Sequence, residues 1–485
     1  MQKKNASSIG QRVLAALCAC AAAGCASNAP YHSTGRDGTN CRSAPSSEEC
    51  LGSVYQDFSS HDIAFAEFSE RGNAFSDQAI ATVLGKIKKQ ADAQGVVLIV
   101  FIHGWKHNAS ETDGNVLDFK DAMLTMSGIL KKAFDGTELG SRRLVGLYVG
   151  WRGASITLPI LEELTFWDRK AVAEELGSGG ITHLLLDLDR ITAGAANNVM
   201  VVVGHSFGGA IVVRAMADVL TERVTNRGPD GRARTFGDGV LVLNPAVEAN
   251  QALPIIEAAL QPPYKPNQLP LFISLSSDAD WPTHHAFPAG QTLGLATWKQ
   301  ADLQRAYYRD RQAPGDPLPL RERHLDATTV GNFAPFLTHR LHGQGQGDAL
   351  SFSLTPCADA AEGCRPMGWT TLTGQPTIGP LPTNYPLYFI KTDASVMTGH
   401  NDIFNPKVRS FVFTVIDDVV RSALRESRTT ARDGDTKLRP RDTDKALRAT
   451  EDAPGASEPP LIASPKRFTD RMNELWKQQQ AGKPL

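Results

Sequence analysis

Residues 199–220 read VMVVVGHSFGGAIVVRAMADVL and contain the most informative pattern in the chain. The first five residues form an apolar, β-branched run typical of a buried strand, and the stretch from Gly209 onward is typical of a helix. Between them the pentapeptide GHSFG, residues 204–208, places Ser206 at a sharp strand-to-helix turn. A nucleophile on such a turn needs glycines on both sides, because side chains there would clash with the neighbouring backbone. The pentapeptide alone occurs by chance, but its position between a strand and a helix makes Ser206 the leading candidate for a nucleophile.

Apolar runs of the same character occur on both sides of this stretch. They are Val96–Ile102, Arg143–Val149, Val240–Leu243, Leu271–Leu275 and Tyr388–Lys391. Continuous apolar runs indicate strands that are buried on both faces of a parallel sheet, and segments with helical spacing, such as residues 119–134, lie between them. Strands that alternate with helices predict right-handed crossovers. The expected fold class is therefore α/β, a mostly parallel, doubly wound sheet with helices on both faces.

These features together resemble the α/β-hydrolase fold, specifically its serine esterases and lipases, over roughly residues 96–424. That family stabilises the oxyanion of its intermediates with two backbone N–H groups. One belongs to the residue after the nucleophile, which is Phe207 here. The other comes from the loop after an early strand, where this chain has His103 and Gly104, so the resemblance implies Trp105 as the second donor. His103 itself is expected to brace this loop by hydrogen bonds.

The resemblance also implies the two partners that a serine hydroxyl needs in order to attack at neutral pH, a base and an orienting acid. In this family they follow the nucleophile in the order acid, then histidine. Asp278 and Asp280 both lie just past a predicted strand; Asp280, which precedes Trp281, matches the family pattern better. His400 lies in the loop after the last predicted strand and is the expected base. The other histidines considered for this role, His284, His285, His339 and His342, are expected to be surface or lid residues.

The stretch 282–385 breaks the alternation of strands and helices, with many Pro, Gly and His residues and one helix-like piece at about 298–311. Since α/β folds bind ligands at the carboxyl ends of their strands, it is interpreted as a lid-like insertion before the last strand. The expected organisation is a signal peptide at 1–24, a tether and N-terminal extension at 25–90, a hydrolase domain at 91–425 and a disordered charged tail at 426–485.

The first 24 residues combine a basic start, a short apolar run and small residues, which predicts a secretory signal. The segment also resembles a bacterial lipoprotein signal, because Ala22-Ala23-Gly24 precede Cys25. That resemblance implies lipidation of Cys25, a membrane contact through this anchor, and an outer-membrane location. An ordinary cleaved signal and secretion are the alternative.

Four cysteines remain once Cys25 is assigned to lipid and two others leave with the signal. The expected disulfides are Cys41–Cys50 and Cys357–Cys364, the simplest of three connectivities in a compartment that permits disulfides.

Charge and motifs exclude several classes of function. The chain has 50 Lys+Arg and 52 Asp+Glu among 485 residues, a net charge of −2, which gives no basic surface for nucleic acid. No phosphate-binding, dinucleotide-binding, zinc-protease or EF-hand pattern is found, so neither a cofactor nor a metal is expected. The family resemblance implies an esterase that cleaves a small-molecule or lipid ester through an acyl-enzyme. Thioester, amide or lipid-directed acyl hydrolysis remains open, as does a catalytically silent binding protein of the cell envelope.

Overall fold

The computed structural model describes residues 29–36, 38–134, 141–151, 172–173, 175–177, 179–193, 198–227, 233, 235–260, 264, 268, 270–295, 301–310, 313–344, 351–356 and 384–432. The predictions for the signal peptide, Cys25, Cys357, Cys364 and the tail beyond residue 432 lie outside these residues.

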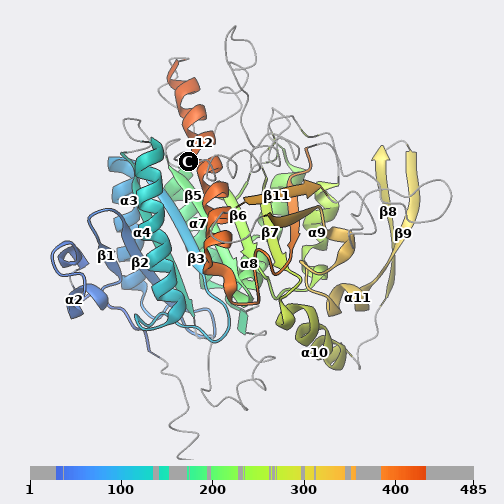
Figure 1. Cartoon of the computed structure of the whole chain (residues 1–485), viewed down its shortest axis with the longest axis horizontal. Coiled ribbons are helices and arrows are strands. Elements are labelled where there is room, and N and C mark those ends of the chain that lie inside the picture. Colours follow the sequence, from blue (N-terminus) through green and yellow to red (C-terminus); the bar gives the residue numbers. More distant parts are fainter. Residues whose placement is uncertain are drawn as a thin grey trace, which may run out of the picture.

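A ten-stranded sheet forms the centre of the molecule (Figure 1). From one edge to the other its strands are β1 (Tyr55–Asp57), β2 (Asp62–Phe68), β4 (Arg143–Trp151), β3 (Val96–Ile102), β5 (Val199–His205), β6 (Gly239–Leu243), β7 (Phe272–Ser277), β12 (Leu387–Thr392), β10 (His339–Gln344) and β11 (Ser351–Pro356). The pairs β1–β2 and β10–β11 are antiparallel, and the pairs between them are parallel. The predicted α/β fold with a mostly parallel sheet is confirmed.

Helices cover both faces of the sheet, because successive strand residues point to opposite sides. In β3, Val97, Ile99 and Phe101 pack with α4 (Gly114–Phe134) and α12 (Pro406–Arg432), which lie next to one another in Figure 1. Val96, Leu98, Val100 and Ile102 face α3 (Asp77–Ala93), α7 (Gly180–Ala193), α8 (Phe207–Thr225) and α9 (Ala249–Ala259). Strands buried on both faces explain why the sequence shows unbroken apolar runs. Within the described residues, none of the helices combines the length and apolarity needed to cross a membrane.

The sheet extends further at both edges than the apolar runs indicate. It begins at Tyr55, inside the stretch expected to be an N-terminal extension, because β2 pairs with β4 over its whole length. At the other edge, β10 and β11 lie within the predicted insertion and add two strands beyond β12. The insertion therefore extends the sheet as well as supplying shorter elements, namely η3 (Pro282–Ala286), α10 (Phe287–Gly294), α11 (Glu322–Ala327) and η5 (Ala334–Phe336). The last helix, α12, continues past the predicted domain end to Arg432.

The prediction of a helix-like segment at about 298–311 is wrong. The chain there forms β8 (Asp302–Asp310), which pairs with β9 (Ala313–Arg321) in a separate two-stranded sheet. In Figure 1 this hairpin lies at the right of the molecule. Helical spacing is a weak indicator, and the ladder of backbone hydrogen bonds with β9 outweighs it.

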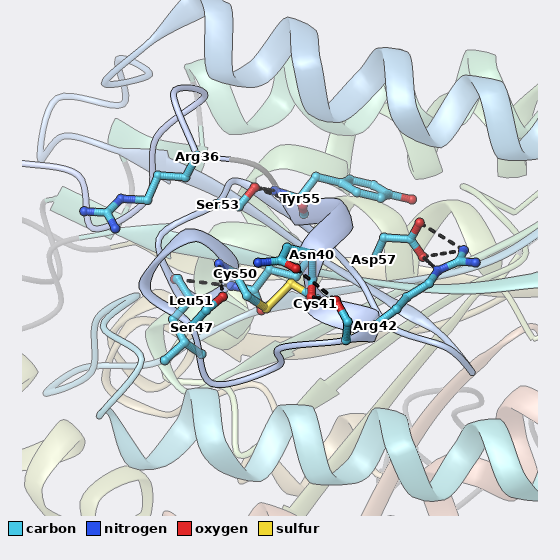
Figure 2. The surroundings of a disulfide bond; sticks show 12 residues. Arg36, Asn40, Cys41, Arg42, Ser47, Cys50, Leu51, Ser53, Tyr55 and Asp57 are labelled. Atoms are coloured by element: carbon cyan, nitrogen blue, oxygen red, sulfur yellow. Dashed lines mark hydrogen bonds and ion pairs between the residues drawn. A yellow bond between two sulfur atoms is a disulfide. The ribbon is translucent and has the colours of Figure 1, made fainter.

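The predicted disulfide Cys41–Cys50 is confirmed, with the two Cα atoms 5.0 Å apart. It joins η1 (Gly38–Arg42) to the short helix α2 (Glu48–Leu51), whose first turn is capped by Ser47. Figure 2 shows this N-terminal strap, residues 38–57, with Arg42 making a two-pronged ion pair to Asp57 beside the disulfide. The last residues of the strap are the edge strand β1 itself, and η1 packs against it.

His32 fixes the chain just before the strap. Its backbone N–H donates to Glu67 (2.9 Å), and its buried ring lies between the carboxylates of Glu67 (2.9 Å) and Glu111 (3.2 Å). Burial alone would lower the pKa of His32, but its hydrogen bonds and ion pairs with Glu111 and Glu67 outweigh that effect, so the pKa is raised. Residues expected in a tether are thus attached to the body from about residue 31.

Candidate active site

Ser206 sits at the turn between β5 and α8, as its sequence pattern predicts. Its backbone has φ 55° and ψ −121°, a strained conformation for a residue with a side chain. Its N–H donates to the carbonyl of Leu243 (3.0 Å), and its own carbonyl accepts from Ala246 (3.0 Å). These bonds hold the strained turn against the end of β6.

The glycines around Ser206 are required by close backbone contacts. A Cβ atom on Gly204 would lie 2.7 Å from the carbonyl oxygen of Gly208. One on Gly208 would lie 2.1 Å from the carbonyl oxygen of Ile102, at the end of β3. Neither position has room for a side chain, which explains the GxSxG spacing.

His400 lies beside Ser206, from which it is 194 residues away in the sequence. Asp280 lies beside His400, from which it is 120 residues away. The Nε2 atom of His400 is 2.7 Å from the hydroxyl oxygen of Ser206. Its Nδ1 atom is 2.9 Å from Oδ1 of Asp280. A proton on Nδ1 would donate to the carboxylate and leave Nε2 free to accept the serine proton.

Asp280 is fully buried just past the end of β7. Its carboxylate accepts hydrogen bonds from the hydroxyl (2.6 Å) and the backbone N–H (3.2 Å) of Thr283, at the start of η3. The hydroxyl bonds Oδ2, and the N–H shares Oδ1 with the ring of His400, so both oxygens have partners, as a buried charge requires. Thr283 was not identified from the sequence.

Asp278, the alternative acid, contacts basic side chains and not His400. Its carboxylate accepts from Arg340 (2.9 Å) and lies 3.3 Å from Nζ of Lys391, a buried side chain on β12. The structure therefore brings Asp280, and not Asp278, to His400.

The other candidate histidines have contacts of their own. The expectation of a surface or lid residue is wrong for His339: it lies on β10, buried against Tyr388 with ring centroids 4.8 Å apart, and burial lowers its pKa to about 4. His342 lies 3.7 Å from Asp393. His284 and His285 lie next to one another on η3, with ring centroids 4.7 Å apart.

The loop after β3 passes close to Ser206. A Cβ atom on Gly104 would lie only 2.8 Å from Cβ of Ser206, so the backbone that leads into Trp105 borders the serine. The next residue, Lys106, has φ 69°. Phe207 begins α8 on the other side of the serine, and its ring centroid is 6.4 Å from that of Trp105. The two residues predicted to supply oxyanion N–H groups thus flank Ser206.

His103 braces this loop, as expected. Its ring is buried and parallel to the ring of Trp151, 5.5 Å away. Its Nδ1 donates to the carbonyl of Gly104 (2.8 Å), while its Nε2 accepts from the N–H of Trp151 (3.0 Å). Burial lowers its pKa to about 4, which keeps the ring neutral and both bonds in place.

Two residues that the sequence analysis did not single out contact the backbone of His400. They are His205, the second residue of the pentapeptide, and Asn244, which follows β6. A polar residue before Pro245 at a strand end is the only sequence signal for Asn244, and it is a weak one.

In the part of the chain that the structure describes, no group of three or more His, Cys, Asp and Glu side chains could hold a metal ion. A cavity of about 460 Å³ lies between the N-terminal strap and α3, lined by Arg36, Tyr55 and Lys86 among others. Its lining residues do not include the loops that carry Ser206, Asp280 or His400.

No family model matches the chain, and no curated protein matches it. Two solved structures of phospholipase PlaB from Legionella pneumophila, one in complex with thio-NAD, are similar to it at 14% and 13% identity, with TM-scores of 0.25 and 0.24. Each match covers 70% of this chain and, at 63% and 64%, somewhat less than two thirds of PlaB.

Proposed function

We propose that this protein is a serine hydrolase that cleaves carboxylic esters through an acyl-enzyme. The observation that carries the proposal is the continuous set of contacts from Ser206 through His400 to Asp280, at 2.7 and 2.9 Å, on a strained turn. A nucleophile, a base and an orienting acid within hydrogen-bond distance are what acyl transfer to serine requires.

In the proposed reaction, Oγ of Ser206 attacks the ester carbonyl while Nε2 of His400 takes the serine proton. Asp280 keeps the ring in the required tautomer and stabilises the imidazolium. When the tetrahedral intermediate collapses, the ester C–O bond breaks and the leaving alcohol takes the proton from His400. Water then attacks the acyl-enzyme, His400 accepts its proton, and the same proton returns to Ser206 as the acid is released.

The N–H groups of Phe207 and Trp105 are the proposed oxyanion donors. Support comes from their position on the two segments that flank Ser206, the start of α8 and the loop after β3. The start of a helix also carries partial positive charge, which favours a developing negative oxygen. Loss of one such donor typically costs about 10²- to 10³-fold in rate.

A panel of acyl substrates tests the proposal and its alternatives. The purified protein should hydrolyse p-nitrophenyl esters in a reaction that depends on Ser206. Ester chains of increasing length, a thioester, an anilide and phospholipid vesicles would separate a plain esterase from a thioesterase, an amidase or a lipid-directed hydrolase. Absence of turnover on the whole panel would instead favour a catalytically silent binding protein.

We also propose that Cys25 carries a lipid that attaches the protein to the outer membrane. The support is the sequence Ala22-Ala23-Gly24-Cys25 after a short apolar run. Changing Cys25 to Ser should move the protein from the membrane fraction to the soluble fraction, because serine cannot carry the lipid that supplies the membrane affinity. Cys18→Ser, within the signal, is the matched control and should leave the protein with the membranes. Continued membrane association of Cys25→Ser would refute the anchor.

A further inference from the structure

The carbonyl oxygen of His400 accepts two side-chain hydrogen bonds. One comes from Nε2 of His205, at 2.9 Å, and the other from Nδ2 of Asn244, at 3.0 Å. A carbonyl oxygen has two lone pairs, so these donors satisfy it fully. The backbone of His400 is therefore held by side chains from two neighbouring strand ends, those of β5 and β6.

Asn244 also contacts the segment that leads to the acid. Its Oδ1 accepts from the N–H of Ser277 (3.0 Å), the last residue of β7, three residues before Asp280. The hydroxyl of Ser277 in turn donates to the carbonyl of Met397 (2.6 Å), in the loop of His400. A single buried amide thus joins the end of the acid's strand to the loop of the histidine.

The backbone conformation of Asn244 is unusual and suits an asparagine. Its φ is 43°, a left-handed conformation that asparagine tolerates better than most residues. Its N–H donates to the carbonyl of Leu275 (2.9 Å), which anchors the residue on β7. The side chain is completely buried, so a lost contact could not be replaced by bulk water.

His205 makes the matching contact from the nucleophile's side. It immediately precedes Ser206, is buried, and lies with its ring centroid 5.0 Å from that of His400. Burial, with the nearby His400 next, holds its pKa well below the ordinary value, so its ring stays neutral when His400 takes up a proton. Its proton must be on Nε2 for it to donate to the carbonyl, which leaves Nδ1 unprotonated.

We propose that Asn244 and His205 are positioning residues that hold the backbone of His400 at a fixed distance from Ser206 and Asp280; this inference rests on the proposed function. They touch neither the substrate nor the atoms that react. Their effect comes from geometry, since a displacement of about 1 Å in a catalytic group can cost about 10²-fold in rate.

Asn244→Asp tests the first residue with little change in volume. The carboxylate keeps an acceptor for Ser277, but it loses the N–H donors and places a second oxygen against the carbonyl of His400. We expect kcat for a p-nitrophenyl ester to fall by about 10²-fold, with KM changed by less than about twofold. Asn198→Asp is the matched control: Asn198 is also buried, accepts from Val96 at the start of β3, and should leave kcat unchanged.

His205→Ala and His205→Gln test the second residue as a pair. The alanine variant loses the donor and should lower kcat about tenfold, close to the value of one hydrogen bond. The glutamine variant can place an amide N–H near the position of Nε2, so it should recover most of the activity. Recovery by glutamine would not be expected if the imidazole took part in proton transfer, because an amide does not titrate.

A double-mutant cycle separates positioning from a general structural role. In a His400→Ala background, Asn244→Asp should not lower the residual turnover further, because there is no ring left to position. An equal loss with and without His400, or full kcat in the folded Asn244→Asp and His205→Ala variants, would overturn the inference. Thermal unfolding midpoints show whether each variant folds. If Asn244→Asp does not fold, the inference is decided by His205→Ala and His205→Gln, each measured with and without His400.

If the parent protein has no Ser206-dependent turnover, the proposed function itself fails, which is a different result.

Discussion

Replacing Ser206 by Ala should lower kcat for p-nitrophenyl esters by about 10⁵- to 10⁶-fold, with little change in KM. Without Oγ no acyl-enzyme forms, and His400 has no proton to take from a side chain at 2.7 Å. The remaining rate would come from substrate binding and the oxyanion donors alone. Steady-state turnover and the initial burst of p-nitrophenol, which reports acyl-enzyme accumulation, measure the effect.

Ser127→Ala is a suitable control for this prediction. Ser127 is a half-buried residue of α4, and its hydroxyl donates to the carbonyl of Leu124. Its replacement should leave turnover and the burst unchanged. Wild-type turnover in a folded Ser206→Ala variant would exclude Ser206 as the nucleophile.

Asp280→Asn should lower kcat by about 10⁴-fold. The amide keeps the shape of the carboxylate, but it can donate a proton to Nδ1 of His400 and so favours the tautomer that cannot accept the serine proton on Nε2. It also removes the negative charge that stabilises the imidazolium. The hydroxyl of Thr283 can still donate to the remaining oxygen and so hold the new amide in the same place, so the loss should appear in kcat rather than in folding.

Asp278→Asn is the matched control, two residues away on the same loop. Its carboxylate pairs with Arg340 and Lys391 and not with His400, so kcat should stay within a few-fold of the wild-type value. Thermal stability should fall modestly, because Lys391 would keep a buried charge with one partner fewer. The opposite pattern, an inactive Asp278→Asn and an active Asp280→Asn, would exchange the roles of the two acids.

The parallel core of the fold could be predicted because its strands are buried on both faces. Each apolar run, such as Val96–Ile102, corresponds to a strand with nearly the same bounds. The edges could not be predicted in the same way. In β2, Ala64, Ala66 and Glu67 dilute the apolar pattern, and β10 reads HRLHGQ, so both depend on pairing with a neighbouring strand.

Some residues of the candidate site could likewise be predicted from the sequence, and others could not. Ser206, His400 and Asp280 could be selected because a turn motif and the order of elements limit where each residue lies, and the structure brings all three together. Their catalytic roles stay a prediction. Asn244 and His205 act through hydrogen bonds to the carbonyl of His400, which is 156 and 195 residues away in the sequence, so only the folded chain shows them. Thr283 is three residues from Asp280, but no sequence pattern marks their contact.

The most direct test of a serine nucleophile at this site is covalent labelling of the full chain with a fluorophosphonate, followed by mass spectrometry of its peptides. We predict one phosphonate adduct, on Ser206, that disappears in Ser206→Ala and is strongly reduced in His400→Ala. A folded protein that forms no adduct, or forms it on another residue, would contradict the account.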